Sequence, residues 1–275
     1  MSGTPFHERS RLRGVESALR QPDIAEVFER VLVPGIFERY ARDLVERARP
    51  IGPSDRILDL GCGTGIVARV LRERLGGAAR ITGLDLSPPM VAMAHTLAPE
   101  LDFREGSAMA LPFETGGFDL VLCQQMLQLV PDPGVALREV RRVLAPGGRL
   151  LVSTWRPRAI QPLHEALGAV AERHLGVPND KRFRLDGDAL RGLLGDAGFI
   201  NVDLTAVTLT EEFREFPVRM SAIAANFDVT SLSDAERESR LAAVEADSAV
   251  ILSRFATKGG VAAPSTTNVA TATAP

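Results

Sequence analysis

The stretch Ile57–Leu71, ILDLGCGTGIVARVL, decides the fold. A short apolar run leads into three glycines in five residues, Gly61, Gly63 and Gly65, and a segment with the apolar spacing of a helix follows. Glycine lacks a Cβ atom, so these positions allow a tight turn and the close approach of a ligand to the backbone. The free amides at the start of the helix favour an anionic group. The stretch therefore predicts a strand, a ligand-binding turn and a helix.

Short apolar runs and longer helical patterns alternate around this turn. Strands are expected at 56–60, 80–86, 101–106, 118–125 and 149–155, with helices at 64–76, 88–98 and 133–144. The order predicts an α/β fold, in which a parallel sheet is covered by helices on both faces. The segment 144–150, LAPGGRL, is expected to end a helix, turn and begin a strand. Two amphipathic helices are expected upstream, at 22–31 and 34–48, with a break at Leu32–Gly35.

The remainder of the chain is mostly helical in pattern. Helices are expected at 160–175, 186–197 and 217–256, and the alternation in 200–213 predicts a long strand. The end of the chain, GGVAAPSTTNVATATAP, reads either as a low-complexity tail or, because of its β-branched residues, as a final strand.

Composition excludes several classes of function. The chain has 275 residues, 45% of them apolar, and a formal net charge of −3, so no positive field attracts nucleic acid or an anionic membrane. No run of about 18 apolar residues predicts a membrane span. The two cysteines, Cys62 and Cys123, lack the partner spacing of a metal site, so no metal is expected. The first residues do not resemble a signal peptide, so we expect a cytoplasmic protein.

Asp85 narrows the choice of ligand. It lies at the end of the second expected strand, where a carboxylate can accept hydrogen bonds from both ribose hydroxyls of a nucleoside. Ser87 fits the role of helix cap better than Asp85 does. The dinucleotide fingerprint requires a glycine where this chain has Ile66, which disfavours a nicotinamide cofactor. Phosphate, dinucleotide and nucleoside ligands remain open on these residues alone.

Four motifs follow one another in order: ILDLGCGTG at 57–65, GLDLSPPM at 83–90, GSAMALPFETGGFDLVLCQQMLQLVPDP at 106–133 and LREVRRVLAPGGRLLVSTW at 137–155. Together they resemble the class I S-adenosylmethionine-dependent methyltransferases, in the branch that includes ubiquinone/menaquinone-type and small-molecule enzymes. The resemblance implies a Rossmann-like sheet of seven strands with an antiparallel last strand. It also implies an N-terminal helical lid at 1–50, a cofactor-binding core at 51–216, a helical insertion capping the substrate at 217–258, and the final strand at 259–275. The helices of the lid also fit a dimer face.

The resemblance assigns the cofactor, S-adenosylmethionine, to particular residues. Gly61 and Gly63 would approach its methionine part and ribose, with Cys62 contributing backbone, and Asp85 would bind the ribose hydroxyls. Phe28 stands where relatives often place an aromatic ring against the cofactor, although helix packing explains it as well.

Further residues would surround the adenine and the methionine. Leu86 and Met90 would sandwich the adenine, and core packing is the alternative for both. Ser107 and Ala108 would line the edge of the ring. Many relatives carry an aspartate in place of Ser107, and serine is the weaker acceptor for the adenine amino group. Gln124 would face the methionine moiety through its side-chain carbonyl.

The expected reaction is transfer of a methyl group to oxygen, nitrogen or carbon of a small, partly apolar metabolite, such as a quinone or a secondary metabolite, leaving S-adenosylhomocysteine. The segment CQQM at 123–126 lacks the Asn/Asp-Pro-Pro-aromatic signature of enzymes that methylate nucleobases or glutamine, and it lacks the carboxylates of metal-dependent catechol enzymes. The chain also has no glutamate-rich loop like that of the protein-arginine enzymes. Orientation of the reactants is then the main task, without a metal. The candidate substrate residues are Tyr40, Gln125, Gln128 and His164, and only His164 is a candidate base.

Other functions stay open on the sequence. A relative of these enzymes can hold the cofactor and catalyse cyclisation or rearrangement, or bind the cofactor without catalysis. A nicotinamide-dependent oxidoreductase is disfavoured by Ile66.

Overall fold

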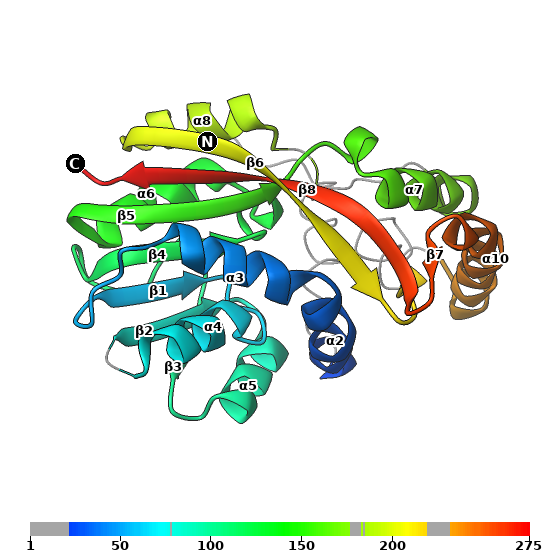
Figure 1. Ribbon diagram of the computed structural model, residues 1–275, viewed down its shortest axis with the longest axis horizontal. Coiled ribbons are helices and arrows are strands. Elements are labelled where there is room, and N and C mark those ends of the chain that lie inside the picture. Colours follow the sequence, from blue (N-terminus) through cyan, green and yellow to red (C-terminus); the bar gives the residue numbers. More distant parts are fainter. Residues whose placement is uncertain (1–21, 78, 177–182, 184, 219–231) are drawn as a thin grey trace.

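The structure, a computed structural model, describes residues 22–77, 79–176, 183, 185–218 and 232–275 (Figure 1). One sheet runs through the molecule in the strand order β3-β2-β1-β4-β5-β8-β6. The strands are β1 (Arg56–Leu60), β2 (Arg80–Asp85), β3 (Asp102–Glu105), β4 (Phe118–Gln124), β5 (Leu144–Trp155), β6 (Ile200–Phe213) and β8 (Gly260–Thr273). The first five are parallel, and β8 lies antiparallel between β5 and β6. The expected Rossmann-like sheet with an antiparallel last strand is confirmed, and a two-residue strand, β7 (Ala256–Thr257), adds to β8.

Helices cover both faces of this sheet. The structure has α2 (Pro22–Val27), α3 (Glu38–Arg47), α4 (Ile66–Leu75), α5 (Pro88–Leu97), α6 (Pro133–Val143), α7 (Pro162–Leu175), α8 (Gly187–Asp196) and α10 (Asp234–Ser253), with short 3-10 turns at Leu127–Leu129 and Arg158–Ile160. Neighbouring residues of a strand point to opposite faces. Ile57 accordingly belongs to the core under α3 and α4, and Leu58 to the core under α6 and α8.

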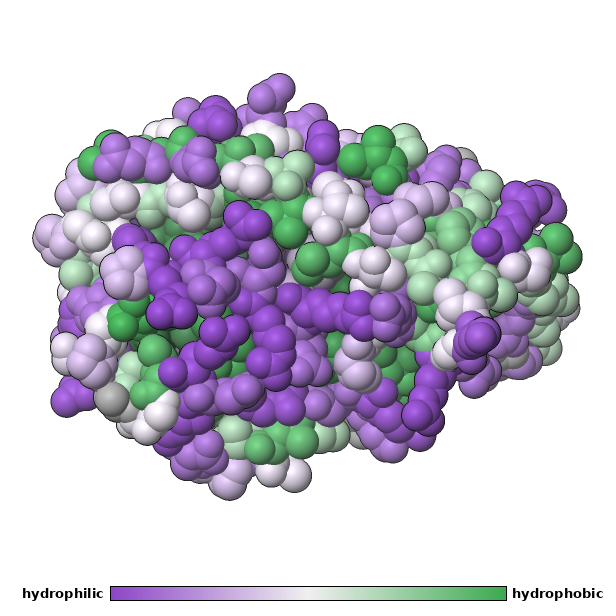
Figure 2. Space-filling model, viewed as in Figure 1, coloured by the Kyte–Doolittle hydropathy of each residue, from purple (hydrophilic) through white to green (hydrophobic). Residues whose placement is uncertain are grey.

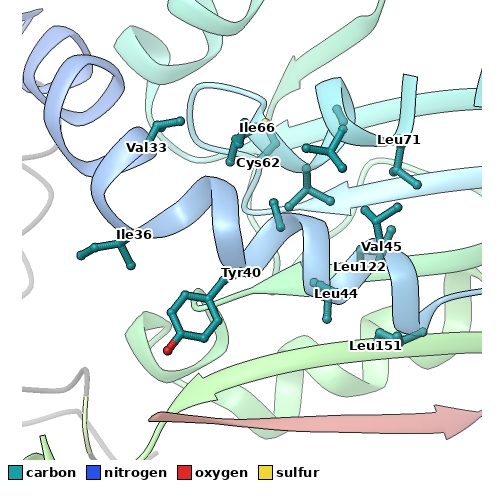
Figure 3. Close-up of a cluster of buried hydrophobic side chains, with 14 of the residues drawn as sticks. Val33, Ile36, Tyr40, Leu44, Val45, Cys62, Ile66, Leu71, Leu122 and Leu151 are labelled. Carbon is teal, nitrogen blue, oxygen red and sulfur yellow. The ribbon is translucent and has the colours of Figure 1, made fainter. Parts of the chain in front are cut away.

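Helix α3 is amphipathic. Its apolar residues Leu44 and Val45 point toward Leu122 and Leu151 of the sheet (Figure 3). Its outward face carries ion pairs, such as Arg42 with Glu38 on the same helix, and hydrophilic residues cover the middle of this face of the molecule (Figure 2). Burial of the apolar face, rather than helix propensity, therefore holds α3 on the sheet.

The expected break between the two N-terminal helices is wrong. A π-helix, η1 (Phe28–Phe37), continues directly from α2 into α3. In the wider π-turn the N–H of Glu38 bonds to the carbonyl of Val33, five residues back, so Pro34 is accommodated within the helix. Gly35 lets η1 approach the sheet, because a Cβ atom there would lie 2.5 Å from Cε1 of Phe213.

The last two long strands extend past the rest of the sheet. β5 ends at Trp155, opposite Thr267, whereas β6 and β8 continue to pair as far as Phe213 and Val261. Helices α7 and α10 pack beside this extension, joined by His174 and Asp247 at 2.8 Å (Figure 1). The chain end is thus a strand and not a tail. Of the expected helical stretch at 217–256, the structure shows α10, and 219–231 lie outside the described residues.

The beginning of β5 differs from the expected turn. Leu144 already pairs with Phe118, and the register then shifts before Arg149 pairs with Leu120. Within the stretch Pro146 to Gly148, the Gly147 N–H donates to the carbonyl of Ala274, the residue after β8, at 2.8 Å. A tertiary hydrogen bond thus replaces a local turn.

Candidate functional site

The glycine turn lies where β1 ends, beside the end of β2. Gly61, Gly63 and Gly65 have φ values of +71°, +54° and +86°. The N–H groups of Gly61 and Cys62 donate to the carbonyl of Leu84 at 2.7 and 3.1 Å, which fixes the turn against β2. A crevice at the carboxyl ends of parallel strands is the usual ligand site of such sheets. The expected strand, turn and helix are confirmed, with α4 beginning at Ile66.

Asp85 is held at the same edge of the sheet. Its Oδ2 accepts from the Gly63 N–H at 2.8 Å, and its Oδ1 accepts from the Ser87 N–H at 2.9 Å. Burial raises the pKa of Asp85, while these hydrogen bonds act in the opposite direction. Each carboxylate oxygen has two acceptor positions, so the group keeps capacity for two more donors. Paired ribose hydroxyls are donors of this kind.

Asp59 is a buried carboxylate that the sequence reasoning did not single out. It is 1% exposed, and its Oδ2 accepts from the Ala68 N–H of α4 at 3.0 Å. Burial raises the pKa of Asp59 to about 7. An aspartate inside the apolar run ILDL was the available signal. Its contact ties the first turn of α4 to β1 and so supports the glycine turn.

Two residues expected to sandwich the adenine have different environments. Leu86, next to Asp85, is 48% exposed and open to a planar ligand, whereas Met90 is 5% exposed and packed in α5. The loop that carries Ser107 and Ala108 follows β3, and its Gly106 N–H bonds to the Asp85 carbonyl at 2.9 Å. The loop therefore lies beside Asp85, as expected for the edge of the same ligand.

Phe28 and Gln124 meet on the other side of the turn. The ring of Phe28 stacks on Phe37 with centroids 4.8 Å apart, and it lies 3.6 Å from where a Cβ atom of Gly63 would stand. The amide of Gln124 donates to the Phe37 carbonyl at 2.9 Å. Its Oε1 is buried and has no hydrogen-bond partner in the described parts of the chain. An acceptor left in this state suits a cationic ligand group.

Gln125 is strained and buried. Its φ is +45°, a conformation that is uncommon for a residue with a side chain. It is 5% exposed, and neither atom of its side-chain amide has a hydrogen-bond partner within the described ranges. Gln128 is fully buried and donates to the Gln125 carbonyl at 2.9 Å, which holds the loop. Strain and unsatisfied polar atoms together are typical of a ligand site.

Tyr40 packs in the core. It is 3% exposed, its ring contacts Trp155 edge-on, and its hydroxyl is bonded to the carbonyl and Oγ of Ser265 at 2.7 and 2.8 Å. Burial raises the pKa of Tyr40 to about 12. The sequence left two roles open for Tyr40, a substrate contact or core packing. The structure supports packing and not a substrate contact, because the hydroxyl already bonds Ser265.

His164 lies in the first turn of α7, with its Nε2 3.2 and 3.1 Å from the two carboxylate oxygens of Glu211. Glu211 is a functional candidate that the sequence reasoning missed. Nothing local marks it, because β6 places it beside a histidine 47 residues away.

The thiols show no sign of reactivity. Cys62 and Cys123 are free and buried, and burial raises the pKa of each. Within the described residues, no three His, Cys, Asp or Glu side chains are grouped as metal ligands. No helix in that part of the chain is long and apolar enough to cross a membrane.

Comparisons with known proteins agree with this geometry. Residues 58–152 match a protein family described as a methyltransferase domain. The chain is 42% identical over 136 residues to a demethylmenaquinone methyltransferase of Thermus thermophilus, covering 48% of this chain and 61% of that protein. It is 43% identical over 104 residues to a ubiquinone biosynthesis O-methyltransferase of Xanthomonas oryzae, covering 36% and 42%. The chain thus spans less than two thirds of the length of these curated relatives.

A solved structure covers more of the chain. The [4+2]-cyclase SpnF is 26% identical with a TM-score of 0.54, and the match covers 86% of this chain and 80% of that one. The similarity therefore extends beyond the segment shared with the sequence relatives.

Proposed function

Because the chain belongs to the class I S-adenosylmethionine-dependent methyltransferase family, we propose that it transfers the methyl group of S-adenosylmethionine to a small, partly apolar metabolite. The observation that carries the proposal is the carboxylate of Asp85, bonded to the turn amide of Gly63 and still able to accept from two further donors. The two named relatives act on demethylmenaquinone and in ubiquinone biosynthesis, which suggests a flat, quinone-like acceptor.

The residues around the turn fit S-adenosylmethionine. Asp85 would accept from the ribose hydroxyls, and exposed Leu86 would cover one face of the adenine, with Met90, Ser107 and Ala108 around it. The unpaired Oε1 of Gln124 would accept from the ammonium group of the methionine part. Gly61, Cys62 and Gly63 would supply backbone, and Phe28 would close the site from η1.

When bound, this cofactor supplies an activated methyl group on a sulfonium. The chain then has to hold an acceptor in line with it and exclude water. Gln125 and Gln128, in the loop after β4, would orient the acceptor, because that loop adjoins the position of the methionine part. The N-terminal helices α2, η1 and α3 and the helix α10 would cover the acceptor.

Calorimetry tests the cofactor. S-Adenosylhomocysteine is expected to bind the full chain, and NAD is not. Tight binding of NAD without binding of S-adenosylhomocysteine would overturn the proposal. Incubation with isotope-labelled S-adenosylmethionine and a metabolite extract, followed by mass spectrometry, then identifies products that have gained one methyl group.

A second candidate function is cyclisation or rearrangement on the same cofactor-binding fold. The similarity to the [4+2]-cyclase SpnF favours it. The two functions differ in what happens to the cofactor. Binding of S-adenosylhomocysteine without any labelled product in the extract would favour the second candidate.

A further inference from the structure

A histidine and a carboxylate are paired away from the glycine turn, on the extension of the sheet. Glu211 of β6 is 1% exposed, and the side chain of His164 is 10% exposed. The Nε2 atom of His164 is within hydrogen-bond distance of both Glu211 oxygens, at 3.2 and 3.1 Å. An ionised carboxylate can only accept, so the pair holds the proton of the neutral ring on Nε2. Nδ1 then carries the lone pair and is the basic atom.

Nδ1 is available for a ligand. None of the residues that the structure describes forms a hydrogen bond with it. The groups facing the pair come from three elements. The Tyr40 hydroxyl of α3 is bonded to Ser265 of β8, and Glu165 on α7 pairs instead with Arg158. No cation among the described residues competes with His164 for Glu211.

Aromatic rings surround His164. The ring centroids of Trp155, Phe183 and Phe216 lie 6.3, 5.8 and 6.2 Å from that of His164. The chain has only one tryptophan and twelve phenylalanines, so three such rings around one histidine form a site suited to a flat apolar molecule. An aromatic acceptor would lie against these rings with a polar group toward Nδ1.

The pair is connected to Gln124 through strand β5, whose Trp155 contacts His164. β4 and β5 are paired so that Gln124 is opposite Ser153, and Trp155 is two residues further on. Two residues along a strand span roughly 7 Å. Trp155 therefore lies about 7 Å along β5 from the residue opposite Gln124, and its ring contacts that of His164.

Stability alone is a poor explanation for the pair. Removing the Glu211 carboxylate from water costs free energy, and the hydrogen bond from a neutral imidazole offsets only part of that cost. A second pair on the same helix, His174 with Asp247, joins α7 to α10 at the surface and is more exposed than His164 and Glu211.

We propose that His164 is the general base of the reaction, that Glu211 is its positioning residue, and that the acceptor atom is the oxygen of a hydroxyl group on a flat apolar ring. This rests on the proposed methyl transfer. The hydroxyl proton passes to Nδ1 while the oxygen forms a bond to the methyl carbon. The carbon–sulfur bond breaks, and its electron pair stays on sulfur. Glu211 stabilises the imidazolium, which later returns its proton to solvent.

The test uses two phenols and three variants of the full chain. 2-Naphthol is the weakly acidic acceptor, and 4-nitrophenol is the acceptor that ionises without a base near neutral pH. The variants are His164→Gln, Glu211→Gln and, as a matched control, His174→Gln. General-base catalysis contributes on the order of 10²–10⁴-fold, so His164→Gln is expected to lose that much in kcat on 2-naphthol.

Three further results are expected. Transfer to ionised 4-nitrophenol is retained in His164→Gln, and His174→Gln resembles the unchanged protein on both phenols. Glu211→Gln lowers kcat on 2-naphthol with little change in KM, and moves the acidic limb of the pH profile. If His164→Gln loses both phenols equally, or neither, His164 is not the base.

A spectroscopic measurement does not depend on turnover. Nitrogen NMR of the imidazoles, assigned by the loss of one signal set in His164→Gln, is expected to show the Nε2–H tautomer in the unchanged protein and a redistributed tautomer in Glu211→Gln. An Nδ1–H tautomer would overturn the assignment.

Calorimetry separates the two levels of the argument. If S-adenosylhomocysteine binds but no phenol is methylated, the hydroxyl acceptor is wrong and the proposed methyl transfer stands. If S-adenosylhomocysteine does not bind, the proposed function itself fails.

Discussion

The carboxylate of Asp85 accepts a hydrogen bond from the backbone N–H of Gly63 at 2.8 Å. This contact joins the end of β2 to the turn after β1, two parallel strands that pair from Arg56 and Arg80 onward. The sheet register thus brings a carboxylate and a strained backbone turn to one edge. A nucleoside that binds there meets a site whose two halves are already aligned.

Replacing Asp85 by alanine is expected to remove most of the cofactor affinity. Each hydrogen bond to a charged group contributes about 1.5–3 kcal/mol, so loss of two ribose contacts raises the Kd for S-adenosylhomocysteine by roughly 10²-fold or more. Calorimetry measures this directly. Asp203→Ala, an exposed position on β6, is the control and should bind normally. Unchanged affinity in Asp85→Ala would refute the ribose contact.

Gly63→Ala tests the turn. Its φ of +54° places alanine in the left-handed region, at a cost of about 1–2 kcal/mol in the free energy of unfolding. The new methyl group would also stand between the backbone and the ring of Phe28. We therefore expect both lower stability in urea and weaker binding of S-adenosylhomocysteine.

Gly76→Ala is the matched control for the turn. Gly76 has a similar φ of +61° at the end of α4, and a Cβ atom there meets nothing within 4 Å. This variant should lose comparable stability and keep its cofactor affinity. Equal affinity losses in the two variants would mean that the turn acts only through stability.

The parts of the fold that depend on local pattern could be predicted from the sequence. The long strand at Ile200–Phe213 has an alternating pattern, and the glycine turn carries its own geometry in three residues. The break expected at Leu32–Gly35 was wrong. Pro34 and Gly35 break helices by their local preferences, but whether they do so depends on the part of the fold that packs against them. Gly35 packs against Phe213, 178 positions away, and this contact has no local sequence signal.

The candidate site, like the fold, could be predicted only where a residue has a local sequence signal. Asp85 follows from its place after the second strand, but Glu211 is one of two adjacent glutamates in an exposed-looking stretch. Only the pairing of β6 with β8 decides that Glu211 points inward while Glu212 pairs with Arg39 at the surface. Contacts between distant strands carry no local signal.

Tyr40→Phe is expected to lower stability without affecting the cofactor. The change removes the hydroxyl that bonds Ser265 and leaves buried polar atoms without that partner, at a cost of about 1–3 kcal/mol in the free energy of unfolding. Urea unfolding measures the loss, and calorimetry with S-adenosylhomocysteine should give the same Kd as for the unchanged chain. A changed Kd with unchanged stability would place Tyr40 in the ligand site.

The same residue gives a pH dependence. The pKa of Tyr40 is about 12 in the folded chain and about 10 when unfolded, so its contribution to stability is complete below pH 10 and falls as pH rises toward 12. Ultraviolet titration of the folded protein should accordingly show no tyrosinate at pH 10.5. Since Tyr40 is the sole tyrosine of the chain, the signal needs no assignment.

Asp59→Asn tests the buried carboxylate beneath the turn. The pKa of Asp59 is about 7 in the folded chain and near 3.8 when unfolded, so the folded state binds more protons between these values. The unchanged protein must therefore lose stability as pH rises from 4 to 7. The loss is at most about 4 kcal/mol, three pKa units at 1.36 kcal/mol each. Asparagine keeps an acceptor for the Ala68 N–H and carries no charge.

The free energy of unfolding of Asp59→Asn should rise relative to that of the unchanged chain as pH increases. Urea unfolding at pH 5 and pH 8 measures it, and the variant should gain on the unchanged chain by a few kcal/mol between the two. Asp203→Asn, an exposed change of the same kind, should show no such gain. If the difference in free energy of unfolding between Asp59→Asn and the unchanged chain is the same at both pH values, Asp59 is ionised in the folded protein throughout this range. Another contact must then stabilise the buried charge.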